Sequence, residues 1–192
     1  QVKTSTRTPL MSVLLEGDVA CGKTALAAKL CKESDLPFIR MISPDAFLGK
    51  GEARKIDILQ KTFVDSYKSS QGIIFLDDIE RLIDFTPVGM RFSNALLQTL
   101  LVLIRKVPPV AGRRLMIVAT TSCASILEDL QLTQAFNVTL HVSQLQNPEE
   151  IKAVLMGGEG GLSEDEAGNI ADAINVLEKP IGIKQLLMVL EM

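Results

Sequence analysis

The chain has 192 residues, 47% of them hydrophobic and 22% charged, and a formal net charge of −3, which is typical of one globular unit with a small appendage. Its basic residues are scattered, so the charge pattern does not favour nucleic acid as a partner. The sequence has neither a signal peptide nor an apolar run of about 18 residues, so we expect no transmembrane segment and only peripheral contact with membranes.

The cysteines, Cys21, Cys31 and Cys123, have no paired spacing and no nearby histidine. This arrangement disfavours a disulfide framework and a zinc site, and it favours a reducing, cytoplasmic setting. The chain begins at Gln1 and ends within an apolar helical pattern at Met192, so both ends look like cuts from a longer protein.

The first strong motif is a phosphate-binding loop at residues 17–24, which match the pattern G-x-x-x-x-G-K-[ST]. An apolar strand is predicted before it, at 10–15, and a helix after it, at 23–34. Glycines let backbone N–H groups curl toward phosphates, and the helix N-terminus adds positive potential. The sequence therefore predicts a site for a nucleoside triphosphate.

Lys23 is predicted to reach the β- and γ-phosphates, and the Thr24 hydroxyl to hold Mg²⁺. Backbone donors and Lys23 are expected to favour the thiolate of Cys21, although a small cysteine that merely packs remains an equal alternative. The nucleotide-contacting residues predicted for this segment are Gly17, Asp18, Val19, Ala20, Cys21, Gly22, Lys23, Thr24, Ala25 and Leu26.

A second buried strand, at 72–77, ends in two carboxylates. Its four consecutive apolar residues are typical of a parallel strand that is covered on both faces. Asp77, at the carboxyl end of this strand, is predicted to bind Mg²⁺ opposite Thr24. The strand therefore supplies the second half of the predicted site.

Strand and helix signals alternate as far as about residue 143, with further strands predicted at 37–42, 115–120 and 138–142 and helices at 52–69 and 93–106. Such alternation predicts a parallel five-stranded sheet with helices on both faces. Ligands bind such sheets at the carboxyl ends of the strands.

Only helical signals follow, at 148–156, 163–177 and 181–192. We therefore expect a nucleotide-binding α/β core at 1–145 and a helical lid at 146–192.

The order of phosphate loop, acidic strand and helical lid resembles the AAA+ ATPases, a class of P-loop NTPases. Across nearly its whole length, the chain resembles the second ATPase domain of the vesicle-fusing ATPases. The runs at 76–82 and 182–187 are the most specific part of this resemblance. The resemblance implies ATP and Mg²⁺ as ligands, a homo-hexameric ring, and a role in disassembling SNARE complexes through an adaptor protein that contacts other domains.

Within the resemblance, three departures predict that binding is retained while hydrolysis is weak. Asp78 stands where most AAA+ enzymes have a glutamate that polarises the attacking water, and its shorter side chain places the carboxylate roughly 1–1.5 Å farther away. Ser122 replaces the usual polar asparagine after the fourth strand. The segment 132–138 contains none of the arginines that reach a neighbour's γ-phosphate in active members.

The resemblance also assigns basic residues to the phosphates. Gly182 precedes the last helix, and Lys184 is implied to touch the phosphates of its own protomer, with a solvated helix-start lysine as the alternative. Arg105 or Lys106, at the end of the helix at 93–106, is implied to reach the neighbour's γ-phosphate, and we favour Arg105. A helix-capping role is an equal alternative for both.

Phe47 precedes Leu48 and Gly49 at a place where AAA+ rings carry a loop that grips polypeptide in the central pore. We expect a pore-facing Phe47 slightly more than a core-packed one, because the glycines around Lys50 indicate a mobile loop. His141, on the last predicted strand, is expected to be satisfied or partly buried and not catalytic.

The leading interpretation is an ATP-binding module that forms a ring and uses the nucleotide as an interface ligand. The main alternative is an active AAA+ motor that hydrolyses ATP and threads a protein through Phe47. A small-molecule kinase shares the phosphate loop but does not explain the pattern around Gly182 and Lys184.

Overall fold

The computed structural model describes residues 8–157, 162–175 and 180–190. The chain divides into two compact units. The core unit comprises Gln1–Glu16 and Lys23–His141, and the helical unit comprises Gly17–Gly22 and Val142–Met192. The phosphate loop up to Gly22 therefore groups with the C-terminal helices, although it follows the first strand directly in the chain.

The core unit is built on a five-stranded sheet in which every pair of neighbouring strands is parallel, in the order β2-β3-β4-β1-β5. The strands are β1 (Leu10–Glu16), β2 (Phe38–Ile42), β3 (Gln71–Leu76), β4 (Arg114–Thr121) and β5 (Val138–His141). All five strands predicted from the sequence are confirmed, with ends that differ by one residue or less.

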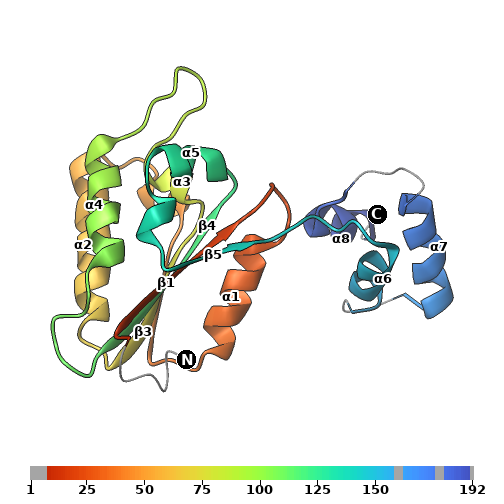
Figure 1. Cartoon of the computed structure of the whole chain (residues 1–192), viewed down its shortest axis with the longest axis horizontal. Coiled ribbons are helices and arrows are strands. Elements are labelled where there is room, and N and C mark those ends of the chain that lie inside the picture. The colour runs from red at the N-terminus through yellow and green to blue at the C-terminus, as the bar shows by residue number, and fades with distance from the viewer. Residues whose placement is uncertain (1–7, 158–161, 176–179, 191–192) are drawn as a thin grey trace. The chain divides into compact units, whose positions relative to one another are not determined.

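Helices cover both faces of this sheet, with α2 and α4 on one face and α1 on the other (Figure 1). The long helices are α1 (Lys23–Glu33), α2 (Glu52–Ser66) and α4 (Asn94–Arg105), as predicted. Four shorter turns of helix were not predicted, because each has six residues or fewer and shows no readable period. These are α3 (Ile79–Leu82), α5 (Ala124–Asp129) and the 3₁₀ turns η1 (Pro44–Phe47) and η2 (Thr133–Ala135).

The apolar strands explain why the sheet is covered twice. Successive side chains of a strand point to opposite faces, so a strand buried on both sides needs an unbroken apolar run. Leu14 and Ile74 pack in one cluster with Phe63 of α2. The adjacent Val13 and Ile73 are also buried, on the alternate face. This double burial holds β1 and β3 inside the fold, and because both strands run parallel to β4, their carboxyl ends lie at the same edge of the sheet.

Strand β5 lies at the edge of the sheet, and all four of its residues are exposed. His141 was expected to be satisfied or partly buried, and the structure gives it a carboxylate partner although 65% of its side chain is accessible. Its Nδ1 lies 3.7 Å from Glu16 Oε1. An edge strand without a helix over it leaves its side chains in solvent, which the alternation of the sequence does not reveal.

The helical unit has a small apolar core of its own. It contains α6 (Pro148–Gly157), α7 (Glu164–Asn175) and α8 (Ile183–Leu190), as the helical periodicities predicted. Parts of those predictions, namely 176–177 and 191–192, lie outside the described residues. The buried residues are Ile151, Leu155, Ala167, Ala171 and Leu186.

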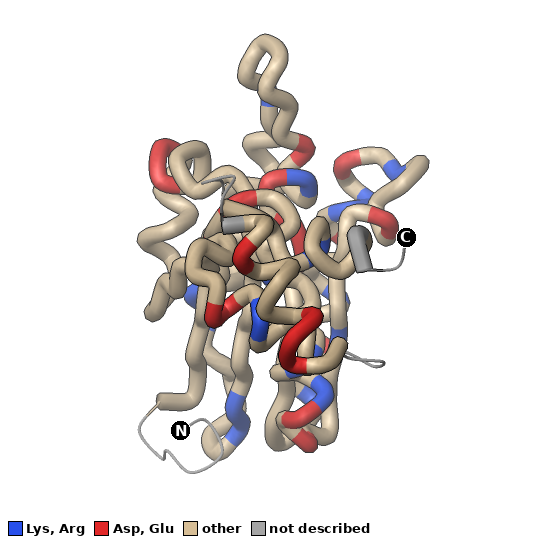
Figure 2. Tube along the Cα trace, turned by 90° about the vertical axis from the view of Figure 1, so that its right-hand side faces the viewer, with Lys and Arg blue, Asp and Glu red and all other residues tan. Residues whose placement is uncertain are grey.

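Charged residues of both signs are scattered along the described chain, as Figure 2 shows. Within the described part of the chain, none of the helices combines the length and the hydropathy that crossing a membrane requires.

Candidate functional site

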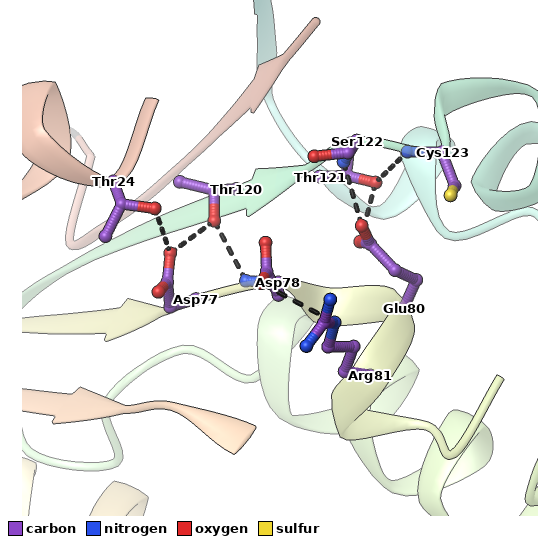
Figure 3. Close-up of polar contacts among 9 residues, drawn as sticks. All are labelled: Thr24, Asp77, Asp78, Glu80, Arg81, Thr120, Thr121, Ser122 and Cys123. Atoms are coloured by element: carbon purple, nitrogen blue, oxygen red, sulfur yellow. Dashed lines mark hydrogen bonds and ion pairs between the residues drawn. The ribbon is translucent and has the colours of Figure 1, made fainter. Parts of the chain in front are cut away.

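The carboxyl end of β3 carries a compact polar network in an otherwise apolar sheet (Figure 3). Asp77 is only 9% exposed, and its Oδ1 accepts a hydrogen bond from the Thr24 hydroxyl at 2.8 Å. The same oxygen accepts a second bond from the Thr120 hydroxyl at 2.7 Å. The structure thus brings together Thr24 and Asp77, the two residues predicted to hold the metal.

Asp78 occupies an unusual backbone conformation. Its φ of 48° and ψ of 65° lie in the left-handed region, where a residue with a side chain is strained. Its N–H donates to the Thr120 hydroxyl at 2.9 Å, and its Oδ2 lies 3.8 Å from Arg81 Nε. Burial, followed by the negative charges of Glu80 and Asp77, raises the pKa of the Asp78 carboxyl above its ordinary value.

Glu80 links the start of α3 to the end of β4. It is 7% exposed, and its carboxylate accepts bonds from the Thr121 hydroxyl at 2.8 Å and from the Ser122 N–H at 2.9 Å. Ser122, predicted from its place after the fourth strand, is thus held through its backbone.

Three residues of this network, Thr120, Thr121 and Glu80, belong to no motif that assigns them a role from the sequence. The signal available was the run of hydroxyl residues that closes the apolar strand at 120–122. A buried strand that ends in several hydroxyls indicates hydrogen-bond partners nearby, because unpaired buried hydroxyls are costly.

The phosphate loop, within the helical unit, is shaped by close backbone contacts. A Cβ added at Gly17, whose φ is +150°, would lie 2.2 Å from the carbonyl oxygen of Val142. Gly22 has a φ of +88°, which also favours glycine, and Ala20 adopts a φ of 70°. The loop therefore has the tight, glycine-dependent path that a phosphate cradle requires.

Gly182 and Lys184 lie against this loop. A Cβ on Gly182 would come within 2.8 Å of the Ala20 carbonyl oxygen, and the Lys184 N–H donates to that oxygen at 3.1 Å. The Lys184 side chain is exposed at the start of α8. The start of the last helix is thus fixed to the loop through its backbone, which leaves the lysine side chain accessible.

The remaining residues of the motif differ in their exposure. Lys23 and Cys21 are buried, whereas Asp18, Val19, Thr24, Ala25 and Leu26 are exposed. The three cysteines are free thiols.

Arg105 ends α4, and its Nη2 donates to the carbonyl oxygen of Gln134 at 3.2 Å. Gln134 belongs to the segment 132–138, which lacks arginines of its own. The Lys106 ammonium instead lies 6.0 Å from the centre of the Tyr67 ring. The structure therefore directs Arg105, and not Lys106, to this segment.

The expectation that Phe47 faces a pore was wrong. Phe47 is 4% exposed and packs in the main core cluster, whereas the next residue, Leu48, is 74% exposed. The 3₁₀ turn η1 ends at Phe47 and directs its ring inward, beneath the Lys55 ammonium at 5.8 Å from the ring centre. The glycines around Lys50 therefore do not indicate the direction of the Phe47 side chain.

The donor set fits Mg²⁺ bound together with phosphates. Among the described residues, no group of three His, Cys, Asp or Glu side chains could hold a metal. Mg²⁺ needs no such group, because it is usually held by one or two protein oxygens, water and phosphate oxygens. The Thr24 hydroxyl donates its proton to Asp77 and keeps lone pairs for a cation.

A family model agrees with this fold and site. The model of the ATPase family associated with various cellular activities (AAA) matches residues 13–144. The chain therefore belongs to the AAA family of ATPases, which confirms the predicted fold class.

Within the AAA family, the chain is similar to several vesicle-fusing proteins. Over its whole length the chain is 45% identical to the vesicle-fusing ATPase of Dictyostelium discoideum and 43% identical to that of Arabidopsis thaliana, and it covers 25% of each. It is also 40% identical, over 200 aligned residues, to the vesicular-fusion protein sec18 of Schizosaccharomyces pombe, of which it covers 24%. The chain thus spans about a quarter of the length of these relatives.

Proposed function

We propose that this chain is the second ATPase domain of a vesicle-fusing ATPase and that its main task is to bind Mg·ATP. The observation that carries the proposal is the 2.8 Å hydrogen bond from the Thr24 hydroxyl to Asp77, because it joins the end of the phosphate-loop motif to a buried carboxylate. Bound Mg²⁺ supplies charge neutralisation for the phosphates.

Each residue then has a defined task. The backbone N–H groups of residues 17–22 and the Lys23 ammonium bind the phosphates, and Thr24 and Asp77 hold the metal. Lys184 and the start of α8 contact the phosphates of the same protomer.

Hydrolysis is slow in this proposal. The short Asp78 carboxylate orients the attacking water poorly, and the backbone-held Ser122 adds no long polar arm. The segment 132–138 brings no arginine of its own to a neighbour. Geometric errors of about 1 Å can reduce a rate about 10²-fold.

The nucleotide stabilises a homo-hexameric ring, with Arg105 as the residue that reaches the phosphates of the adjacent protomer. Its bond to Gln134 holds the guanidinium beside the segment where active AAA+ domains carry their own arginines. A ligand bound at each subunit boundary favours the assembled ring by mass action. In the complete cytoplasmic protein, the ring serves the disassembly of SNARE complexes through an adaptor.

Size-exclusion chromatography with light scattering, in Mg·ATP and without nucleotide, tests this proposal when phosphate release is followed in the same sample. We expect a hexamer only with ATP and a rate below about 10⁻² s⁻¹. A monomer that turns over ATP at about 1 s⁻¹ or faster would support the motor alternative instead.

A further inference from the structure

Thr120 makes hydrogen bonds with Asp77 and Asp78, the two consecutive residues that follow β3. It is fully buried at the end of β4, and its hydroxyl donates to Asp77 Oδ1 at 2.7 Å while it accepts from the Asp78 N–H at 2.9 Å (Figure 3). A hydroxyl has one proton to give and lone pairs to receive, so both bonds form at once.

The two contacts restrain different features. Asp77 Oδ1 accepts hydrogen bonds from two hydroxyls that belong to different elements of the fold. One is the Thr120 hydroxyl, and the other is the Thr24 hydroxyl, which lies 2.8 Å from this oxygen. Asp78 adopts a left-handed backbone conformation, which is unfavourable for a residue with a side chain. The hydrogen bond from its N–H to Thr120 stabilises this conformation. One buried hydroxyl thus restrains both the carboxylate and the turn that follows it.

We infer that Thr120 is a positioning residue that orients the Asp77 carboxylate toward Mg²⁺ and fixes the turn that carries Asp78. The inference rests on the proposed function, because it assigns Thr120 a role through Asp77 at the same site. Partners that orient a metal ligand from behind change metal affinity by about 10- to 100-fold when they are removed.

The next residue of the strand offers a matched control. Thr121 is as fully buried as Thr120, but its hydroxyl donates to Glu80 Oε2 at 2.8 Å. Successive side chains of β4 point in opposite directions, so the two threonines serve different carboxylates. Thr120→Val and Thr121→Val each remove one buried hydroxyl at nearly constant volume, and only the first removes a contact with Asp77.

The test is a Mg²⁺ titration of the binding of a fluorescent ATP analogue to the 192-residue chain, with its two valine variants and Thr120→Ser. We expect Thr120→Val to raise the Mg²⁺ concentration at half-saturation about 10-fold or more. Thr121→Val is expected to change it less than about twofold, and Thr120→Ser to restore the unmodified value, because serine keeps the hydroxyl. Analogue binding in EDTA is expected to be equal in all four chains.

Each result decides between the proposals. If analogue binding to the unmodified chain does not depend on Mg²⁺, the proposed Mg·ATP function fails. If it does depend on Mg²⁺ and Thr120→Val titrates like the unmodified chain, only the role of Thr120 is overturned. The same holds if both valine variants shift equally, because a general loss of packing then accounts for the effect.

Hydrogen exchange in the unmodified chain covers the case in which Thr120→Val does not fold. With ATP present, adding Mg²⁺ is expected to slow exchange of the Asp78 amide, which donates to Thr120, more than that of the Ser122 amide, which donates to Glu80. Equal changes at the two amides would overturn the inference.

Discussion

The core unit and the helical unit each hold residues predicted to bind a ligand, and each unit stabilises its own residues in a different way. In the core unit, Asp77 is oriented by two side-chain hydroxyls, that of Thr24 at the start of α1 and that of Thr120 at the end of β4. In the helical unit, the loop at 17–22 is shaped by backbone contacts with Val142 and Gly182 that leave no room for a Cβ. Removing hydroxyls should therefore affect the core unit, and adding a methyl group to a glycine should affect the helical unit.

The largest effect is expected for Gly17→Ala. The added Cβ would lie 2.2 Å from the Val142 carbonyl oxygen, at a φ of +150° that side chains rarely adopt. We expect a loss of about 3 kcal/mol in the free energy of unfolding, measured by urea denaturation. Gly49→Ala is the control, because its φ is +70° but nothing lies within 4 Å of the new Cβ. An equal loss in both variants would assign the effect to backbone strain alone.

Gly182→Ala separates crowding from strain. Its Cβ would lie 2.8 Å from the Ala20 carbonyl oxygen and 3.0 Å from the Ala20 Cβ. We expect a cost of about 2 kcal/mol in stability together with weaker nucleotide binding, because the contacted residue belongs to the phosphate loop.

Gly168→Ala, in α7, meets no atom within 4 Å and is the matched control. It should stabilise the chain by about 0.5–1 kcal/mol, since alanine favours a helix over glycine. Stabilisation by both alanines would show that the helical unit does not depend on a close approach at Gly182.

Asp78→Glu tests the proposal that the short side chain of Asp78 makes ATP hydrolysis slow. The longer side chain is expected to raise the rate of phosphate release about tenfold, by bringing the carboxylate closer to the water. Asp78→Gln has the same length but cannot accept a proton, so it should not raise the rate. An unchanged rate in Asp78→Glu would mean that the length of this side chain does not limit hydrolysis.

The smallest effect is the pH dependence of stability at Asp78. Its pKa is raised in the folded chain, so ionisation costs stability as the pH rises from the ordinary Asp pKa of about 3.9 through the folded-state pKa. Asp78→Asn should therefore gain stability relative to the unmodified chain toward neutral pH and lose that advantage in acid.

Asp65→Asn should show the opposite sign. The hydrogen bond from Lys68 lowers the pKa of Asp65, so its contribution is present at neutral pH and is lost as the pH falls through the folded-state pKa. Urea denaturation between about pH 3 and 7 measures both variants. Curves that move in the same direction would contradict the assigned causes.

The sequence predicted the elements better than the directions of side chains. Unbroken apolar runs and helical periods located the five strands and the long helices, because burial on both faces leaves a strong pattern. The Thr24–Asp77 pair was also predictable, since both residues follow from motifs.

The contacts of Thr120 and the burial of Phe47 were not predictable in this way. The Thr120 bonds depend on the parallel register that pairs Leu76 with Ala119, and the apolar pattern does not specify that register. Phe47 points into the core because η1 turns there, and a turn of four residues has no period to read. In the structure the phosphate loop groups with the helical unit, where Ala20 and Gly182 come into contact although they lie far apart in the chain.

The most direct test of the account is calorimetric titration of the chain with Mg·ATP, alongside the Lys23→Ala variant. We predict saturable binding of one ATP per chain that weakens at least about tenfold in EDTA and is lost in Lys23→Ala. Equal binding by the unmodified chain and by folded Lys23→Ala, or no binding by either, would contradict the claim that this loop and Asp77 form a Mg·ATP site.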